Sequence, residues 1–279
     1  MGEERRIVHL IRRADDVRKA EAARQDPSLA RAQAEELLAE ARELLDDVPP
    51  GSERQELTTQ VTRRIGDIDR EELETMLVPT PGVARAPTHI DDPSRVPPGQ
   101  RLTPGWPVLH VGTLPDVEDP EQWRITVTGR VAERIVLTLP ELQRLPAVER
   151  TTDVHCVTRW SRLDNTWTGV RVGEVLRLAR PRPEATHAVV AGHPAYTANL
   201  DLAALQADDV LLAWAHDGAP LELVHGGPLR LVVPSRYGWK SVKWVTEIRL
   251  TDRDVPGYWE ERGYHDVADP WQEQRYRDD

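Results

Sequence analysis

The sequence contains one cysteine and no phenylalanine in its 279 residues, and the shortage of cysteine excludes several classes of redox site. Cys156 alone cannot form an intramolecular disulfide, a zinc site built from cysteines or a four-cysteine iron–sulfur cluster. A C-x-x-C-H motif for covalent haem attachment is excluded for the same reason. Any redox chemistry in this chain therefore needs a noncovalent cofactor or the sulfur of Cys156.

The sequence also lacks long apolar runs and an excess of basic residues. No run approaches the roughly 18 apolar residues that span a bilayer, so we expect no membrane insertion. The formal net charge of -11 opposes nonspecific binding to nucleic acid or anionic lipid, although a local basic patch can still bind a small phosphate-bearing molecule. Arg5 and Arg6 are not followed by an apolar segment, so we expect no signal peptide and a cytoplasmic location.

Aromatic residues are absent from residues 1–80, because every Trp and Tyr lies at or after Trp106. Apolar residues recur there at helical spacing, namely Ile7, Ile11, Ala14, Val17, Leu37, Leu38, Ala41, Leu44, Leu45, Val48, Leu57, Val61 and Ile65. Asp26-Pro27 is typical of a helix start, Pro49-Pro50-Gly51 of a helix end, and Ser52 with Gln55 of a capping box. We expect a three- or four-helix bundle with solvated charged faces; partner binding is the alternative.

Prolines crowd residues 81–106, which predicts an extended connector rather than a helix. From residue 107 onward the apolar periodicity changes toward two. The expected strands lie at about 123–128, 229–233 and 247–250, and the expected short helices at about 139–144, 172–179 and 202–206. We therefore predict an α+β domain over residues 107–279, without repeating βαβ units.

Cys156 lies in a segment, residues 151–161, that is too polar for an ordinary core strand. A thiolate is a soft metal ligand, and neighbouring His155 and Arg159 would favour the ionised form if they lie close to the sulfur. The alternative is a small buried cysteine at the end of a strand. The residues alone leave both interpretations open.

A second unusual segment, residues 225–244, joins a hydrophobic strand to a loop that is rich in hydrogen-bond donors. Its glycines allow backbone N–H groups to approach an anion. The side chains that can donate to a phosphate are Arg230, Lys240, Ser241 and Lys243. In an acidic protein this cluster indicates a phosphate site; the alternative is a surface loop whose cations pair with Asp or Glu.

Other catalytic motifs find little support. His225-Gly226-Gly227 is weakly similar to the oxyanion segment of lipases and esterases, but the sequence has no G-x-S-x-G nucleophile elbow. There is no H-E-x-x-H pair, and His187 with His193 is a weak metal-site candidate that we expect on an exposed loop.

Four segments, in order, resemble the molybdenum-cofactor domain of the sulfite oxidase-like oxidoreductase family, in its bacterial branch. They are residues 101–108, 155–161 with 167–170, 225–244, and 259–265 with 269–271. The resemblance extends over residues 97–276, about two-thirds of the chain. It implies a β-rich molybdopterin-binding domain, preceded here by the helical module, and a molybdenum cofactor (Mo-molybdopterin).

The resemblance also implies roles for individual residues. Cys156 matches the thiolate ligand of molybdenum, and Tyr264 matches a tyrosine near the metal that donates a hydrogen bond to the exchangeable oxygen. The residues implied to hold the cofactor and its phosphate are His155, His225, Arg230, Lys240, Ser241 and Lys243. Arg159 is expected to attract an anionic substrate; a structural salt bridge with Asp153 or Asp164 is the alternative.

The implied reaction is oxygen-atom transfer on a small substrate such as sulfite or a sulfoxide. Two electrons would be exchanged with a separate haem or flavin protein, since no haem, flavin or immunoglobulin-like dimerisation domain follows. Sulfite oxidases have Ala-Gly-Asn-Arg-Arg after the ligand cysteine, where this chain has Val-Thr-Arg-Trp-Ser. The Trp160-Ser161 pair is more similar to the bacterial sulfoxide reductases. Those enzymes have a twin-arginine signal, which we do not find here. The alternatives are a sulfite dehydrogenase proper and a non-catalytic cofactor-binding or scaffold protein whose helices recruit a partner.

Overall fold

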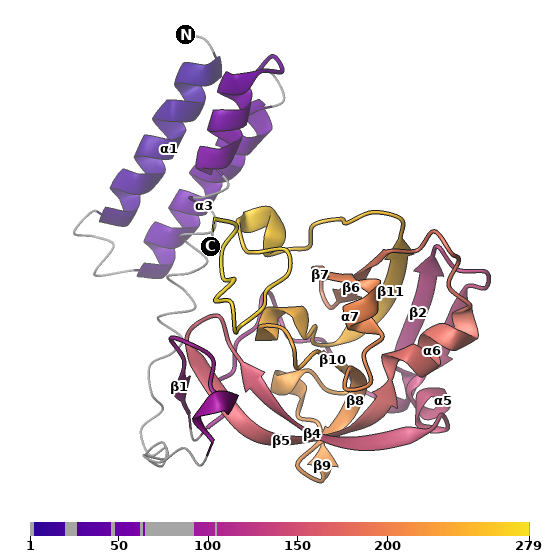
Figure 1. Cartoon of the computed structure of the whole chain (residues 1–279). Helices are drawn as coiled ribbons and strands as arrows, with labels where there is room; N and C mark the ends of the chain where they lie inside the picture. Colours follow the sequence, from indigo (N-terminus) through magenta and orange to yellow (C-terminus); the bar gives the residue numbers. More distant parts are fainter. Residues whose placement is uncertain are drawn as a thin grey trace. The chain divides into compact units, whose positions relative to one another are not determined.

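The computed structural model describes residues 3–19, 27–45, 48–61, 64, 92–103 and 105–278 (Figure 1). The chain divides into two compact units, Met1–Met76 and Leu77–Asp279. Residues 81–91 and 104 of the predicted connector, and Ile65 of the predicted third helix, lie outside the described residues. The predicted domain limits at residues 80 and 106 therefore stay predictions. None of the helices in the described ranges is long and apolar enough to cross a membrane.

The smaller unit is helical and has an aliphatic core. Helices α1 (Glu3–Lys19) and α3 (Pro27–Leu44) pack together, and residues 52–61 are also helical. Its buried residues are Ile7, Leu10, Ile11, Ala14, Ala34, Leu38, Ala41, Leu45, Val48, Leu57 and Val61. Most of them belong to the apolar positions predicted from helical spacing, which explains how this unit forms a core without aromatic residues.

The larger unit contains two sheets and short helices (Figure 1). The six-stranded sheet consists of β1 (Arg101–Leu102), β4 (Ala147–His155), β5 (Trp160–Arg171), β8 (Leu211–His216), β9 (Ala219–Pro220) and β10 (Arg230–Val232). The five-stranded sheet has the order β3 (Ile135–Thr138), β2 (Arg124–Gly129), β11 (Val245–Thr251), β6 (His187–Gly192) and β7 (Tyr196–Asp201). The helices are α5 (Leu139–Gln143), α6 (Val172–Ala179) and α7 (Leu202–Leu205).

Local sequence explains these elements. In β2, Ile125 and Val127 are buried while Arg124 is exposed, as expected for a strand with one face on the core. Helix α6 buries residues at positions i, i+3, i+4 and i+7, which are Val172, Val175, Leu176 and Ala179. Thr138 and Glu141 form a capping box at the start of α5. The predicted α+β class is confirmed.

Strand pairing brings the two site segments and the connector together. Strand β4 pairs antiparallel with β5, with His155 opposite Ser161, so the residues between them form a tight turn. Strand β1 pairs parallel with β5, with Arg101 opposite Trp160. Because Gln100 precedes β1 and Cys156 follows β4, the end of the connector lies beside the cysteine turn.

Candidate functional site

The turn between β4 and β5 holds the sulfur of Cys156 in a defined position. The backbone N–H of Cys156 donates to the carbonyl of Trp160 at 2.8 Å, and that of Arg159 donates to the carbonyl of Cys156 at 3.0 Å. Arg159 has φ 68°, the left-handed conformation that reverses the chain. The hydroxyl of Thr158 donates to Sγ of Cys156 at 3.2 Å. The sulfur is therefore buried and already accepts one hydrogen bond.

The cation that acts on this sulfur is Lys243, which differs from the prediction. Burial raises the pKa of the Cys156 thiol, while the hydrogen bond from Thr158 and the charge of Lys243 lower it. Burial lowers the pKa of His155 to about 4, so its ring is neutral, and its Nδ1 lies 2.8 Å from Oγ of Ser161. The expectation that His155 supplies charge to the thiolate is therefore wrong.

Gln100 is a contact of the cysteine turn that the sequence did not single out. Its Nε2 donates to the carbonyl oxygen of Cys156 at 3.0 Å. Burial raises the pKa of the nearby Tyr237 hydroxyl, against smaller lowering effects of the charge of Arg275 and of Gln100. The only available signal was position, because Gln100 directly precedes the segment that resembles the family.

Arg230 and Lys243 lie together without a carboxylate. Arg230 is 5% exposed and donates through Nη1 to the carbonyl of His225 at 2.7 Å and through Nη2 to the carbonyl of Ser241 at 3.3 Å. Lys243 donates through Nζ to the carbonyl of Val224 at 2.7 Å. Neither cation forms an ion pair with an Asp or Glu in the part of the chain that the structure describes.

The pKa values of Arg230 and Lys243 are lowered because neither cation has a carboxylate partner to offset desolvation. Burial lowers the pKa of Arg230 to about 10. Burial and the charge of Arg230 lower the pKa of Lys243 to about 7. Buried cations normally have an anionic partner, because desolvation of an unpaired charge is costly. The Arg230–Lys243 pair therefore has the electrostatics of a binding site for an anion.

Gly226 allows the two cations to approach each other. Its φ is 109°, and a Cβ at this position would lie 3.0 Å from Cβ of Arg230 and 3.1 Å from Cβ of Lys243. A side chain at residue 226 would thus push the two cationic residues apart, in addition to straining the backbone. The glycine is explained by this packing.

Lys240 belongs to a different, structural cluster. Its Nζ lies 2.6 Å from Oε1 of Glu260 and donates to the backbone and side-chain oxygens of Asn199 at 2.9 and 2.5 Å. Lys240 and Glu260 are both fully buried. These partners use the three donors of the ammonium group, so the expected help of Lys240 in phosphate binding does not fit the structure.

The other donors of the predicted phosphate site, in residues 225–244, are partly occupied as well. Oγ of Ser241 accepts a hydrogen bond from the backbone N–H of Val233 at 3.0 Å, and its hydroxyl proton can still donate to a ligand. The backbone N–H groups of Gly226 and Gly227 both donate to carbonyl oxygens of the preceding turn at 3.0 Å. These two N–H groups are therefore not available to an anion.

Trp106 covers His225. The two rings are stacked with centroids 3.8 Å apart and planes 4° apart, and the guanidinium of Arg230 lies 5.5 Å from the Trp106 ring. Burial and the neighbouring cations lower the pKa of His225 to about 4. Its Nδ1 is buried and has no hydrogen-bond partner among the residues described, so this nitrogen is available to a ligand.

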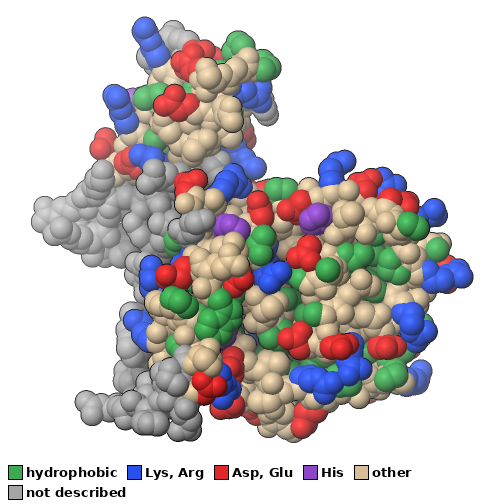
Figure 2. Space-filling model, in the orientation of Figure 1, with side chains coloured by type: hydrophobic (Ala, Val, Ile, Leu, Met, Phe, Trp, Pro, Cys, Tyr) green, Lys and Arg blue, Asp and Glu red, His purple; other side chains and the backbone are tan. Residues whose placement is uncertain are grey.

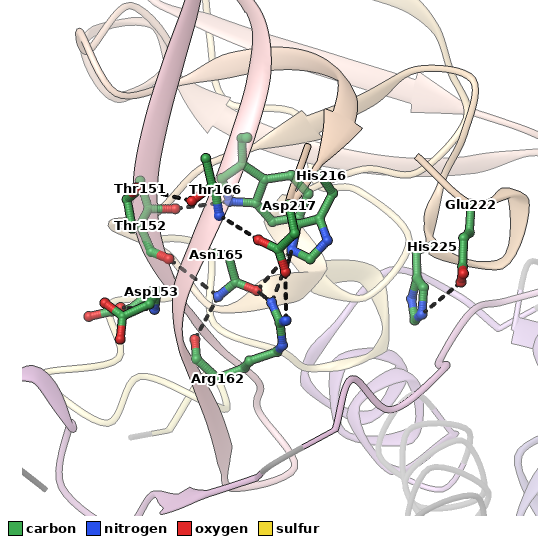
Figure 3. Close-up of polar contacts among 12 residues, drawn as sticks. Thr151, Thr152, Asp153, Arg162, Asn165, Thr166, His216, Asp217, Glu222 and His225 are labelled. Carbon is green, nitrogen blue, oxygen red and sulfur yellow. Dashed lines mark hydrogen bonds and ion pairs between the residues drawn. The ribbon is translucent and has the colours of Figure 1, made fainter. Parts of the chain in front are cut away.

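Arg162 and His216, which contact the Trp106 ring, belong to a polar network with Asn165 and Asp217. Figure 3 shows the hydrogen bonds of this network. Arg162 donates through Nη2 to Oδ2 of Asp217 at 2.8 Å, and its Nη1 lies 3.0 Å from Nε2 of His216. Nε2 of His216 also lies 3.2 Å from Oδ1 of Asn165, so this nitrogen faces both a donor and an acceptor. Burial lowers the pKa of His216 to about 4, in agreement with a neutral ring. The His216 ring lies 4.4 Å from that of Trp106.

Tyr264 lies in an aromatic cluster. It is 1% exposed, and its ring centroid lies 4.7 Å from that of Trp259, 5.1 Å from that of Trp239 and 5.3 Å from that of Tyr276. Indole Nε1 of Trp239 donates to Glu260, the partner of Lys240. The ring of Tyr264 is therefore held firmly, and its expected position near the metal stays a prediction.

The alternative role considered for Arg159, a salt bridge with Asp153 or Asp164, is wrong. Both carboxylates pair instead with Arg95, at 2.6 Å each. Arg159 is exposed, and its Nη1 would lie 3.0 Å from a Cβ on Gly99. The guanidinium thus points toward the connector beside the cysteine turn, and its role with an anionic substrate stays a prediction.

The donor set fits a metal that is carried by an anionic organic cofactor. Within the described ranges, no group of three or more His, Cys, Asp or Glu residues is placed to hold a metal ion. What the site offers is one soft sulfur, two cations that lack carboxylates, and an unpartnered nitrogen on His225. These groups match a molybdopterin whose metal takes Cys156 and whose phosphate takes Arg230 and Lys243.

Comparison with known proteins agrees with this chemistry. Residues 111–259 match the family model described as oxidoreductase molybdopterin binding domain. The uncharacterized oxidoreductase YuiH of Bacillus subtilis (strain 168) is 44% identical over 186 residues, covering 67% of this chain and 94% of YuiH.

Two other relatives carry more specific names. The protein-methionine-sulfoxide reductase catalytic subunit MsrP of Gluconobacter oxydans is 33% identical over 174 residues, covering 54% of this chain and 55% of MsrP. The mitochondrial sulfite oxidase of Drosophila melanogaster is 29% identical over 176 residues, covering 53% of this chain and 30% of the oxidase. This chain thus spans about half of the reductase and less than a third of the oxidase.

Proposed function

Since this chain belongs to the sulfite oxidase-like family of molybdopterin-dependent oxidoreductases, we propose that it catalyses oxygen-atom transfer on a small substrate. It is an enzyme, and its cofactor is molybdopterin. The observation that carries the proposal is the meeting of one buried thiol, Cys156, with two cations that have no carboxylate, Arg230 and Lys243. When bound, the cofactor supplies a metal that exchanges two electrons and an oxygen atom with the substrate.

The residues of the chain bind and orient that cofactor. Cys156 is the thiolate ligand, with Thr158 donating to its sulfur. Arg230 and Lys243 bind the phosphate, and Nδ1 of His225 hydrogen-bonds the pterin. Trp106 covers the His225 ring and excludes water from it. Neutralising a dianionic phosphate in this way removes the penalty that the two desolvated cations otherwise impose.

For the substrate, we propose a neutral sulfoxide ahead of sulfite. Sulfite is an anion and needs several cations that face the reacting centre. After the ligand cysteine this chain has one cation, Arg159, where sulfite oxidases have two adjacent arginines. Trp160 and Ser161 carry no charge; both are buried, and Oγ of Ser161 is hydrogen-bonded to His155. Reduction of a sulfoxide to a thioether needs no anion pocket.

A sulfite dehydrogenase is the second candidate, and exposed Arg159 favours it. Two electrons would then pass from sulfite to a separate haem or flavin protein. In sulfoxide reduction, the haem or flavin protein would instead supply the two electrons. A cytoplasmic location is likewise a prediction, which fractionation of the source cells would test.

The test begins with protein made in a host that synthesises the cofactor. We expect about one molybdenum per chain by elemental mass spectrometry. Reduced protein should be reoxidised by methionine sulfoxide or dimethyl sulfoxide, and oxidised protein should be reduced by sulfite slowly or not at all. Cys156→Ser should abolish both reactions, because a hydroxyl is a poor replacement for a soft thiolate. Wild-type turnover in Cys156→Ser would contradict the assignment, and rapid reduction by sulfite alone would favour the second candidate.

A further inference from the structure

We propose that the exposed ring of Trp271 is the contact through which a one-electron carrier protein with a positively charged face exchanges electrons with the Cys156 site. The inference rests on the proposed function, because it concerns electrons that reach or leave the cofactor. It adds the docking position and the charge of the partner.

Trp271 combines exposure with closeness to the site. It is 46% exposed, more than any other large hydrophobic side chain in the described ranges, and Val267 on the same loop is 43% exposed. The Trp271 ring lies edge-on to the ring of His155, with centroids 6.0 Å apart at 73°. His155 is 4% exposed and is bonded to Cys156 through one peptide link. One ring contact and one peptide therefore connect a solvent-exposed ring to the metal-binding residue.

The exposed ring is held by its own loop. The backbone N–H of Trp271 donates to Oδ1 of Asp269 at 2.8 Å, and Nε2 of Gln272 donates to Oδ2 of Asp269 at 3.2 Å. The backbone N–H of Asp269 donates to the side chain of Gln274 at 3.1 Å. A large aromatic ring that is exposed but fixed loses little conformational entropy on contact, as is typical of interface anchors.

The charge around this ring selects the partner. Residues 264–274 contain Asp266, Asp269 and Glu273 and no Lys or Arg. Glu273 pairs with Arg275 and lies near the guanidinium of Arg159 at Gly99, whereas no salt bridge to Asp266, which is exposed, or to Asp269 is found in the described ranges. Figure 2 shows acidic and basic side chains interspersed over the visible face of the larger unit. A small apolar contact with an acidic surround fits a basic carrier that docks briefly, as electron-transfer complexes do.

The electron balance requires two encounters for each turnover. In the oxidative direction, the carrier's ferric haem gains one electron per encounter and becomes ferrous, while the enzyme loses one electron. Two such encounters remove the two electrons that one substrate molecule delivers. For a reductive reaction both transfers run in reverse, from ferrous haem to the enzyme.

The experiment uses the full chain, with basic cytochrome c as the carrier and acidic flavodoxin as the probe of opposite charge. Binding is measured by calorimetry at low and high salt for wild type, Trp271→Leu, Trp271→Phe and Asp266→Asn. Val136→Ala is the matched control, because Val136 is 39% exposed on β3 of the other sheet. Reduced protein, freed of excess dithionite, is then reoxidised by cytochrome c or by ferricyanide.

We expect Trp271→Leu to weaken cytochrome binding about tenfold and to slow reoxidation by cytochrome c by a similar factor, the loss of one interface anchor. Trp271→Phe should retain most of both, Asp266→Asn should lessen the salt dependence, and flavodoxin should bind more weakly throughout. Reoxidation by ferricyanide should be unchanged. Equal binding and equal rates in wild type and Trp271→Leu, or an equal loss in Val136→Ala, would overturn the inference. Failure of the wild type to bind molybdenum would instead overturn the proposed function, while the binding arm would still test Trp271.

Discussion

The segment from His225 to Trp244 buries cationic side chains in two opposite ways. Lys240 lies 2.6 Å from Oε1 of Glu260, and both residues are inaccessible to solvent. Three positions further along, half-buried Lys243 lies with Arg230, and within the described ranges these two cations donate to backbone carbonyls and form no ion pair with a carboxylate. Lys240, buried with its carboxylate, is therefore part of the scaffold, whereas buried Arg230 and half-buried Lys243, which have no carboxylate, are arranged for a ligand.

The largest expected effect comes from removing Lys240. Lys240→Met leaves Glu260 charged and buried, so we expect the free energy of unfolding to fall by about 3–5 kcal/mol. Urea unfolding of the cofactor-free protein measures it. The double variant Lys240→Met with Glu260→Leu should recover most of the loss. A single variant as stable as wild type would erase the contrast between the two clusters.

Removing Lys243 should raise the free energy of unfolding of the cofactor-free protein, whereas removing Lys240 lowers it. Lys243→Met takes away a desolvated charge that has no carboxylate, so the cofactor-free protein should gain about 1 kcal/mol of unfolding free energy. The measurement belongs at pH 6, where an amine with a pKa of about 7 is mostly protonated. If Lys243→Met destabilised the protein as much as Lys240→Met, Lys243 would be structural too.

The neutral histidines extend the contrast to pH. The pKa of His216 is about 4 in the folded protein and 6.5 as its ordinary value, so the unfolded chain takes up its proton first. Stability from this group is complete above pH 6.5 and is lost as the pH falls toward 4, by at most about 1.4 kcal/mol per pH unit. His216→Gln should flatten this part of the stability profile, and an unchanged slope would show that the pKa of His216 is the same in the folded and the unfolded protein.

The last prediction concerns Trp106, which covers the ring of His225. Trp106→Leu keeps apolar bulk but removes the stack on His225, which should cost about 0.5–1.5 kcal/mol. Urea unfolding measures the stability, and titration of the His225 ring by NMR should show its pKa rising toward 6.5 as water enters. An unchanged His225 titration would mean that Trp106 does not shield the ring.

Local patterns predicted the short helices of the larger unit and the strands β2, β10 and β11, but not the other strands. The spacing of Val172, Val175 and Leu176 was enough for α6, and alternation of Ile125 and Val127 was enough for β2. These elements follow from periodicity, which is a property of neighbouring residues. The division into two sheets was not predicted, because the pairing of β11 with β2 joins residues more than a hundred positions apart.

The candidate site was predicted in its residues but not in its pairing. Cys156, Arg230 and Lys243 were identified by chemistry and by resemblance. Spacing did not reveal that Glu260 neutralises Lys240, or that Arg95 takes the carboxylates offered to Arg159. Such partners are set by tertiary contacts, and they decide which cation is free for a ligand.

The central claim is that Arg230 and Lys243 are carboxylate-free because they bind an anionic cofactor. It is tested most directly by molybdenum and pterin content in wild type, Lys243→Ala and Arg236→Ala, all made in the same cofactor-producing host. Arg236 is the matched control, because it lies in the same segment and pairs with Asp201 at 3.4 Å. We predict about one cofactor per chain in wild type and Arg236→Ala, and about a tenfold loss in Lys243→Ala, the effect of one lost charge-assisted contact. Full occupancy in Lys243→Ala, or an equal loss in Arg236→Ala, would contradict the account.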